Sequence, residues 1–393
     1  MTPPTPEGPR APVAIVATEN YPVPPVLGGA VAAYVSELAP RLGGRDVTVV
    51  SVRHPGLADT EQLGRVRHRR VAPPAPLRSL VRLVPTRRSW RGDAEKRAYV
   101  EQVARVLRGF EGTIVVGNRP RSVPRLRRAA PGARLVLRLD NLHLKDPEAL
   151  AACDALLPCS AFVGDAVARV LDGRVPVHVA HNGVDLDAFR PHDPAERIEA
   201  RRSLGLAPES PTVLFVGRLV PDKGAHRLLE AVPGLLRARP DLSVVIVGSA
   251  RFGRGQPTAY ERELRAQAEA IGPAVHLAGF VPPAALPLWF AAADVFCAPG
   301  LWDEPFGMVY AESMAAGVPP VGTARGGIPE VVVDDESGLL LPRSPSAEDV
   351  EEHLLALLED DALRERLARA GRTRAEERFS WEAMARSVEA VLR

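Results

Sequence analysis

The chain has 393 residues, which is enough for two domains of ordinary size. Its composition, 46% hydrophobic and 25% charged, is that of a globular protein and excludes intrinsic disorder. No segment approaches the roughly 18 consecutive apolar residues that a membrane-spanning helix needs, and the start MTPPTPEGPR lacks the apolar region of a signal peptide. Three cysteines without metal-ligand spacing predict a reducing, cytoplasmic compartment and no disulfide framework.

The net charge of +2 conceals an uneven distribution. Residues 1–190 carry 28 basic and 18 acidic side chains, whereas residues 191–393 carry 22 and 30, which suggests two domains with different partners. Within the basic half, residues 63–92 contain nine arginines and no acidic residue. This segment either contacts an anionic membrane surface or a negatively charged acceptor, or is a solvated loop. A nucleic-acid partner is not expected, because aromatic residues make up only 5% of the chain.

In the first half, short apolar segments alternate with helical ones. Strands are expected at residues 12–17, 46–52, 113–116, 135–139 and 175–180. Helices are expected at residues 28–42, 93–109, 121–130 and 160–171. Apolar strands separated by helices predict a parallel sheet that is covered on both faces.

The second half repeats this alternation. Strands are expected at residues 212–216, 242–247, 275–277, 295–298 and 318–321. Helices are expected at residues 222–238, 258–271, 305–316 and 345–370, and Pro233 should kink or shorten the first of them.

The fold prediction is therefore α/β: two doubly wound, Rossmann-like domains, residues 1–190 and 191–378, that face each other across a cleft. A last helix over residues 379–393 is expected to pack back on the first domain. Ligands of such sheets bind outside the carboxyl ends of the strands, so the segments that follow the strands are the candidate sites.

The first such segment is GRLVPDKG, residues 217–224, directly after the strand VLFV. Arg218 offers a planar fork for phosphate oxygens, and Lys223 adds a compact cation. Asp222 is expected to cap the following helix, whose N-terminus adds a positive field. These features favour an anion such as a diphosphate, whereas the structural alternative is a surface turn with a solvated arginine.

The second segment is WDEPFGMVYAESMAAG, residues 302–317. Pro305 is expected in the first helical turn, which places Glu304 at the start of the helix. Glu312, eight residues later, suits ribose hydroxyls. The first backbone N–H groups of a helix lack partners and suit phosphate or sugar oxygens, here those of Phe306, Gly307 and Met308. The alternative is an ordinary capped helix with two incidental glutamates.

Together with GGIPE, residues 326–330, these two segments resemble the E-x7-E motif and the Arg/Lys pair of the retaining GT-B glycosyltransferases of glycosyltransferase family 4. The stretch LGGAVAAYVSELAPRLGGRDVTVVS resembles the family's glycine-bearing loop and first helix, and HNGVDLDAF resembles its segment before the domain crossover. The final helix with Phe379 and Trp381 also fits, so the resemblance covers nearly the whole chain. PVPPVLGGA, VGNRPRS and LDNLHL are most similar to the spore-coat-like subgroup.

The resemblance implies roles for the donor-side residues. Arg218 and Lys223 would neutralise the diphosphate of a nucleotide-sugar donor, for which a UDP-sugar is the favoured candidate. Glu304 would hold donor-sugar hydroxyls together with backbone groups at the helix start, and Glu312 would hold the ribose. Further donor contacts are implied at Gly29, near the phosphate, and at Phe280 and Val281, which line the base pocket.

On the acceptor side this chain departs from the resemblance. Many family members have a histidine at the end of the strand 135–139, where this chain has Asp140, followed by Asn141 and His143. Asp140 is a candidate catalytic residue that accepts a hydrogen bond from a substrate hydroxyl, and the alternative is a helix N-cap. Further acceptor candidates are Glu19, Asn118 and His143. The alternative for Asn118 is a turn at Asn-Arg-Pro, and the alternative for His143 is a helix-start or core histidine.

The leading hypothesis is a retaining hexosyltransferase that moves a sugar from the donor to an unidentified acceptor hydroxyl by front-face displacement, with the diphosphate held by Arg218 and Lys223. No cofactor or metal is expected, because Asp185 and Asp187 lie at the crossover, away from the diphosphate motif. The alternative from another class is a non-catalytic coat or assembly protein with this fold. A nicotinamide-dependent enzyme is excluded, since no G-x-G-x-x-G follows the first strand.

Overall fold

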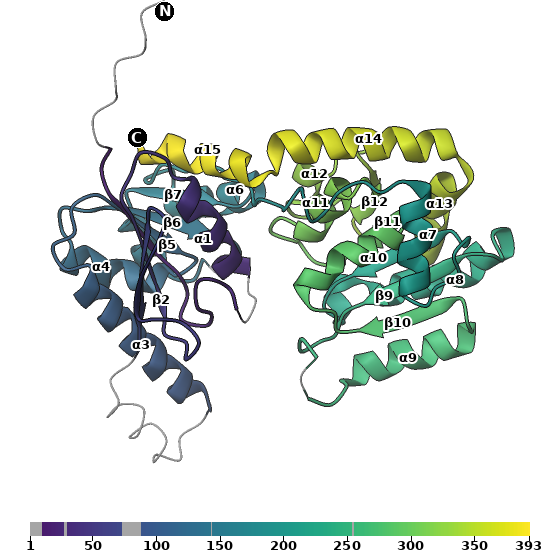
Figure 1. Ribbon diagram of the computed structural model, residues 1–393, viewed down its shortest axis with the longest axis horizontal. Coiled ribbons are helices and arrows are strands. Elements are labelled where there is room, and N and C mark those ends of the chain that lie inside the picture. Colours follow the sequence, from purple (N-terminus) through teal and green to yellow (C-terminus); the bar gives the residue numbers. More distant parts are fainter. Residues whose placement is uncertain (1–9, 27–29, 73–87, 143, 254) are drawn as a thin grey trace, which may run out of the picture. The chain divides into compact units, whose positions relative to one another are not determined.

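The structure, a computed structural model, describes residues 10–26, 30–72, 88–142, 144–253 and 255–393 (Figure 1). It divides into two compact units. Unit 1 contains Met1–His181 and Met384–Arg393, and unit 2 contains Asn182–Ala383. The sequence placed the first boundary at residue 190. Residues 182–189 instead belong to unit 2, because Val184 N donates to Phe379 O at 2.7 Å and Gly183 lies against the Trp381 ring.

Unit 1 contains a seven-stranded sheet in the order β3-β4-β2-β1-β5-β6-β7. Its strands are β1 (Val13–Val16), β2 (Val47–Val52), β3 (Thr60–Leu63), β4 (Val66–Val71), β5 (Thr113–Gly117), β6 (Arg134–Leu139) and β7 (Ala155–Pro158). All neighbours pair in parallel except β3 and β4, which are antiparallel. The inner strands are apolar and buried, as expected for a sheet covered on both faces.

The helices of unit 1 alternate with these strands. They are α1 (Ala30–Arg41), α3 (Arg88–Val106), α4 (Val123–Ala129), α5 (Pro147–Ala151) and α6 (Ala161–Leu171). The end of α15 (Trp381–Leu392) belongs to the same unit. There, buried Arg45 donates to Leu392 O at 3.2 Å, and Arg10 pairs with Glu389 at 3.0 Å.

Two expectations for unit 1 were wrong. Residues 175–180 form no strand. They run beside β7 with a single bridge at Val177, since Pro176 has no N–H to donate to a ladder. Part of the arginine-rich segment is the strand β4 instead of a loop, with alternating exposure. Arg67 and Arg69 are exposed, whereas buried Arg70 donates to Val23 O at 3.0 Å.

Unit 2 contains a six-stranded, fully parallel sheet in the order β10-β9-β8-β11-β12-β13. Its strands are β8 (Thr212–Val216), β9 (Ser243–Val247), β10 (Val275–Gly279), β11 (Val295–Ala298), β12 (Pro320–Thr323) and β13 (Leu339–Leu341). The chain order reverses between β8 and β11, and doubly wound sheets bind ligands at this switch point. Unit 1 has the corresponding point between β1 and β5.

Helices cover the sheet of unit 2 (Figure 1). They are α7 (Pro194–Ser203), α8 (Ala225–Ala238), α9 (Ala259–Ile271), α10 (Leu286–Ala292), α11 (Met308–Ala315), α12 (Ile328–Val331), α13 (Ala347–Glu359) and α14 (Asp361–Arg378). Among the described residues, no helix has both the length and the apolar character needed to cross a bilayer.

Three helix predictions in unit 2 needed correction. Pro233 does not end α8 early. The helix continues to Ala238, and its buried face packs on α13, which offsets the one lost hydrogen bond. The segment 345–370 forms two helices, because the side chain of Asp360 caps the second by accepting from Leu363 N at 2.9 Å. The third correction, the start of α11, concerns the site itself.

Candidate active site

At the switch point of unit 2, the loops after β8 and β11 interlock. Leu301 N donates to Asp222 O at 2.8 Å. Gly224 has φ +76°, and a Cβ at this position would clash with the carbonyl of Pro299. Only glycine can adopt this backbone conformation and also leave room for the Pro299 carbonyl. The loops that carry the two motifs, some 80 residues apart in the sequence, therefore pack directly against each other.

Lys223 is held by the second of these loops. Its Nζ donates to Oε2 of Glu304, and it lies 4.7 Å from the centroid of the Trp302 ring. Trp302 Nε1 donates to the same Glu304 oxygen at 2.9 Å. The side chains of Lys223 and Glu304 are each 21% exposed, so the pair is within reach of a ligand. The sequence analysis missed the role of Trp302, although an indole N–H two residues before a glutamate was a usable signal.

Arg218 follows β8 directly and is exposed. Within the described part of the chain its guanidinium makes no hydrogen bond or ion pair, so this planar fork is available to an oxyanion. The capping role expected for Asp222 was wrong. The N-cap of α8 is Gly224, and Asp222 lies in the preceding 3₁₀ turn, Pro221–Lys223.

The helix α11 begins at Met308, three residues later than expected, so Pro305 is not in its first turn. Its N-cap is Gly307, with φ +95°, where a Cβ would lie 2.6 Å from the Tyr310 ring. Gly307 and Met308 thus occupy positions whose N–H groups have no intrahelical acceptor. The ring of Phe306 is buried and packs edge-on against Phe379 at 5.6 Å.

Because the helix starts late, Glu304 is positioned by a loop instead of a helix. Gly327 N donates to Glu304 O at 2.7 Å, and Gly326, with φ +59°, has no room for a Cβ beside the Glu304 backbone. The GGIPE segment therefore serves to hold the Glu304 backbone in place. Sequence patterns alone gave no such function to these glycines.

Glu312 lies in α11 and is half-buried. Its burial raises the pKa of the carboxyl group to about 7, since desolvation disfavours the charged form. Within the described residues, the Glu312 side chain makes no hydrogen bond or ion pair. A carboxyl group in this state suits hydrogen bonds with ligand hydroxyls.

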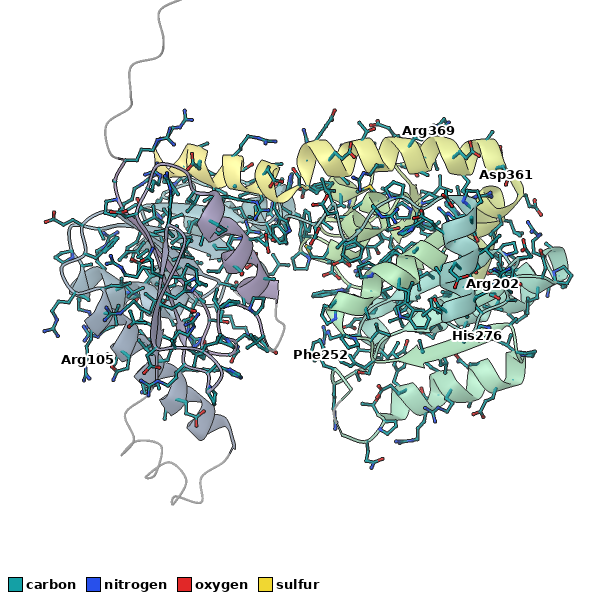
Figure 2. All side chains as sticks on the ribbon, viewed as in Figure 1. Arg105, Arg202, Phe252, His276, Asp361 and Arg369 are labelled. Atoms are coloured by element: carbon teal, nitrogen blue, oxygen red, sulfur yellow. The ribbon has the colours of Figure 1, made fainter. Side chains whose placement is uncertain are left out.

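Two exposed aromatic side chains follow the neighbouring strands. Phe280, after β10, is 43% exposed, and Phe252, after β9, is 59% exposed (Figure 2). Phe280 lies against Gly253, where a Cβ would be 3.0 Å from its ring, and Val281 continues the same loop. A pocket of about 200 Å³ lies beside them. It is lined by Leu219, Ile246, Gly248, Glu261, Leu264 and Leu277, among others.

In unit 1, the acceptor candidates lie at the carboxyl ends of β1, β5 and β6. The side chain of Glu19 is 9% exposed and pairs with Arg119 at 2.6 Å. Asn118 has φ +47°, and its Oδ1 accepts from Asp140 N at 3.3 Å. This is the turn geometry that the sequence analysis gave as the alternative for Asn118.

The carboxylate of Asp140 accepts from Arg138 Nε at 2.7 Å. The N-cap expected as its alternative is supplied by Asp146, which accepts from Ala149 N at 3.2 Å at the start of α5. The two remaining first-domain predictions, Gly29 and His143, lie outside the described residues. Among the residues that the structure describes, no cluster of His, Cys, Asp and Glu could hold a metal ion.

Known proteins were compared with this chain. Residues 196–374 match the family described as Glycosyl transferases group 1. Spore coat protein SA of Bacillus subtilis is 32% identical over 96% of this chain and 98% of its own length. The chain belongs to the group 1 glycosyltransferases.

The chain is also similar to a curated relative over about half of its length and to a solved structure over nearly its whole length. A GDP-mannose-dependent monoacylated alpha-(1-6)-phosphatidylinositol monomannoside mannosyltransferase of Corynebacterium glutamicum is 35% identical over 54% of each chain. The structure of Anabaena HepE in complex with UDP and glucose matches with a TM-score of 0.73 at 20% identity, covering 98% of this chain and 99% of HepE. This likeness identifies the GT-B fold and confirms the predicted fold class.

Proposed function

We propose that this protein transfers a sugar from a nucleoside diphosphate donor to an acceptor hydroxyl with retention of anomeric configuration. One observation carries the proposal: Arg218, Lys223 and Glu304 come from two interlocked loops at the switch point of unit 2. This is where doubly wound sheets take their ligands. Two cations beside the start of a helix suit a diphosphate.

The cations would act mainly on the leaving group. Negative charge builds on the diphosphate as the glycosidic bond breaks, so Arg218 and Lys223 would bind it more strongly in the transition state than in the ground state. Glu304, shared with Trp302 and Lys223, would accept from hydroxyls of the donor sugar. Glu312 would hold the ribose. The backbone beside Gly307 would contact the phosphate or the sugar.

For retention we infer a front-face displacement. The acceptor oxygen bonds to the anomeric carbon on the face from which the diphosphate departs, and a phosphate oxygen takes the acceptor proton. Asp140 of unit 1 would accept a hydrogen bond from a substrate hydroxyl without acting as a nucleophile. Because no residue needs to form a covalent intermediate, the paired carboxylate of Asp140 suits this route.

For the donor base we propose uridine, with Phe280 and Val281 beside it. HepE, which shares the fold, is named in complex with UDP. Guanosine is the competing choice, since the corynebacterial relative is named as GDP-mannose-dependent. That relative also acts on a lipid-linked, anionic acceptor according to its name. An anionic or membrane-bound acceptor would suit the exposed Arg65, Arg67 and Arg69 of unit 1.

We further propose that the reaction takes place in the cytoplasm and needs no metal ion. The three cysteines are buried and form no disulfide bond, as reducing conditions allow. Burial raises the pKa of Cys153 and of Cys159 to about 12, so neither thiol is suited to act as a nucleophile at neutral pH. The two cations would compensate the diphosphate charge that a metal ion neutralises elsewhere.

A thermal-shift panel of UDP, GDP, ADP and dTDP tests the proposal. A nucleotide at a hundredfold excess over its Kd should stabilise the protein by about 2.7 kcal/mol. The shift should be lost in Lys223→Ala and kept in Lys96→Ala, which removes an exposed lysine of unit 1. It should persist in EDTA. A shift that survives Lys223→Ala would place the nucleotide elsewhere.

A second candidate function is supported by the similarity to Spore coat protein SA along nearly the whole chain. In this case the chain would be a structural component of an assembly and would bind no nucleotide. The absence of any shift with all four nucleotides, together with no hydrolysis of their sugar derivatives, would favour this candidate over the transferase.

A further inference from the structure

A fully buried arginine lies in the middle of the sheet of unit 1. Arg138 is in β6, between Gly117 of β5 and Leu157 of β7, and its side chain has no exposed surface. A charge in such a position is costly unless it is closely paired. The sequence analysis treated this strand as simply apolar and gave Arg138 no role.

The guanidinium of Arg138 is held on three sides. Its Nε donates to Asp140 Oδ1 at 2.7 Å, and its Nη1 donates to Ala180 O. The Tyr34 ring of α1 lies 4.6 Å below it. Two of these partners, Ala180 and Tyr34, come from segments other than that of Asp140, so they hold the guanidinium independently of Asp140.

Asp140 is also held through its backbone. Asp140 N donates to the Oδ1 of Asn118, and Asn118 N donates to Arg138 O at 2.9 Å. The carboxylate is about one-fifth exposed, whereas Arg138 is not exposed at all. The carboxylate is thus held by a buried cation and stays partly exposed, at the carboxyl end of β6, the edge of the sheet where ligands bind.

Stability alone does not explain this arrangement. A buried ion pair is often matched or exceeded in stability by apolar side chains of similar volume. An apolar residue at position 138 would also agree with the rest of β6, in which Leu135, Val136, Leu137 and Leu139 are all buried. The pair is better explained by what it does to Asp140.

We propose that Arg138 is a positioning residue, which holds the carboxylate of Asp140 in one orientation so that its outer edge accepts a hydrogen bond from a substrate hydroxyl. This inference rests on the proposed transferase function. It makes Arg138 part of the machinery without any contact between its own side chain and the substrate.

A double-mutant cycle of Arg138→Met and Asp140→Asn tests the proposal. Each single variant should lower kcat by about 10- to 100-fold, with less than about a threefold change in the donor KM. In the Asp140→Asn background, Arg138→Met should lower kcat by less than about a further twofold, because the two substitutions remove the same function. Arg138→Lys, which keeps the charge and loses the fork, should restore part of kcat. Additive losses would overturn the proposal.

Controls separate positioning from folding. Arg125→Met removes another ion-paired arginine of unit 1, whose partner is Glu101 on the surface, and should leave kcat unchanged. The nucleotide thermal shift should be the same in wild type and in all of these variants. If Arg138→Met does not fold, the cycle is carried out with Arg138→Lys, for which additive losses have the same meaning.

A crystal structure of Arg138→Lys provides a readout that does not depend on turnover. The proposal expects the Asp140 carboxylate to leave its present orientation or to become disordered. An unchanged Asp140 would overturn it even if the wild type transferred no sugar. An inactive wild type with a displaced Asp140 would instead count against the proposed function and leave the positioning role supported.

Discussion

The carboxyl ends of the two sheets both carry charged side chains but arrange them differently. In unit 2, Arg218 has no ion-pair partner among the described residues, and Lys223 shares a partly exposed pair with Glu304. In unit 1, Glu19 and Asp140 are each engaged by an arginine, Arg119 and Arg138. In unit 2, positive charge is therefore available to an anionic ligand. In unit 1 the charges are paired with one another, so only the outer edges of the carboxylates can accept hydrogen bonds from ligand hydroxyl groups.

The largest expected effect comes from removing the cations of unit 2 that are available to a ligand. Arg218→Ala and Lys223→Ala should each lower kcat/KM by about 100- to 1000-fold, the range seen when one stabilising donor of a developing charge is removed. Steady-state kinetics with the nucleotide sugar that the thermal-shift panel selects would measure this. A loss of less than about threefold in kcat/KM would mean that these side chains do not contact the ligand.

Removing one partner of an ion pair in unit 1 should instead lower the stability of the protein. Arg119→Met leaves the nearly buried Glu19 carboxylate without its partner, and we expect a cost of about 2 kcal/mol in the free energy of unfolding. Urea denaturation would measure this cost, and the nucleotide thermal shift should be unaltered. If Arg119→Met kept normal stability but lost nucleotide binding, the proposed difference between the two units would be wrong.

The interlock of the unit 2 loops can be tested with two glycines of similar conformation. Gly224 and Gly205 have φ +76° and +71°, but only at Gly224 would a Cβ meet other atoms. Gly205→Ala should cost about 1 kcal/mol from conformational strain alone. Gly224→Ala should cost about 1–2 kcal/mol more and should weaken nucleotide binding. Equal losses of stability in the two variants would contradict the interlock.

The smallest effect concerns pH. Burial raises the pKa of Glu312 from the ordinary value of 4.5 to about 7, so between these values the folded state binds more protons than the unfolded state. Stability due to this group should therefore fall as the pH rises from about 4.5 to 7. Glu312→Gln should reduce the stability difference between pH 5 and pH 8 by roughly 1 kcal/mol, after discounting for partial exposure. Chemical denaturation at both pH values would show this.

Much of the local structure followed from the sequence. Alternating apolar and helical segments predicted the two parallel sheets, and the glycine-bearing motifs after strands predicted where the donor-side residues lie. These signals are local, because a strand, its following loop and the next helix are contiguous in the chain. The donor-side candidates apart from Trp302 follow from these sequence patterns, and their roles stay predictions.

Two of the errors share a physical cause. The late start of α11 depends on Gly326 and Gly327, which hold the Glu304 backbone from about 20 residues away in the chain. The extension of α8 through Pro233 depends on packing against α13. In both cases tertiary contacts outweighed the local preference of a proline.

By itself, then, the sequence determined the fold class, the alternation of strands and helices in both halves, and which candidate side chains follow which strand. The tertiary structure alone decided which charges are paired. The ion pair between Glu19 and Arg119 joins residues 100 positions apart, and no local pattern reports it. Even Arg138 and Asp140, only two residues apart, could be understood only once Tyr34 and Ala180 were seen to enclose the guanidinium. Burial and pairing depend on segments that meet only in the folded chain, and they decide whether a charge is available to a ligand.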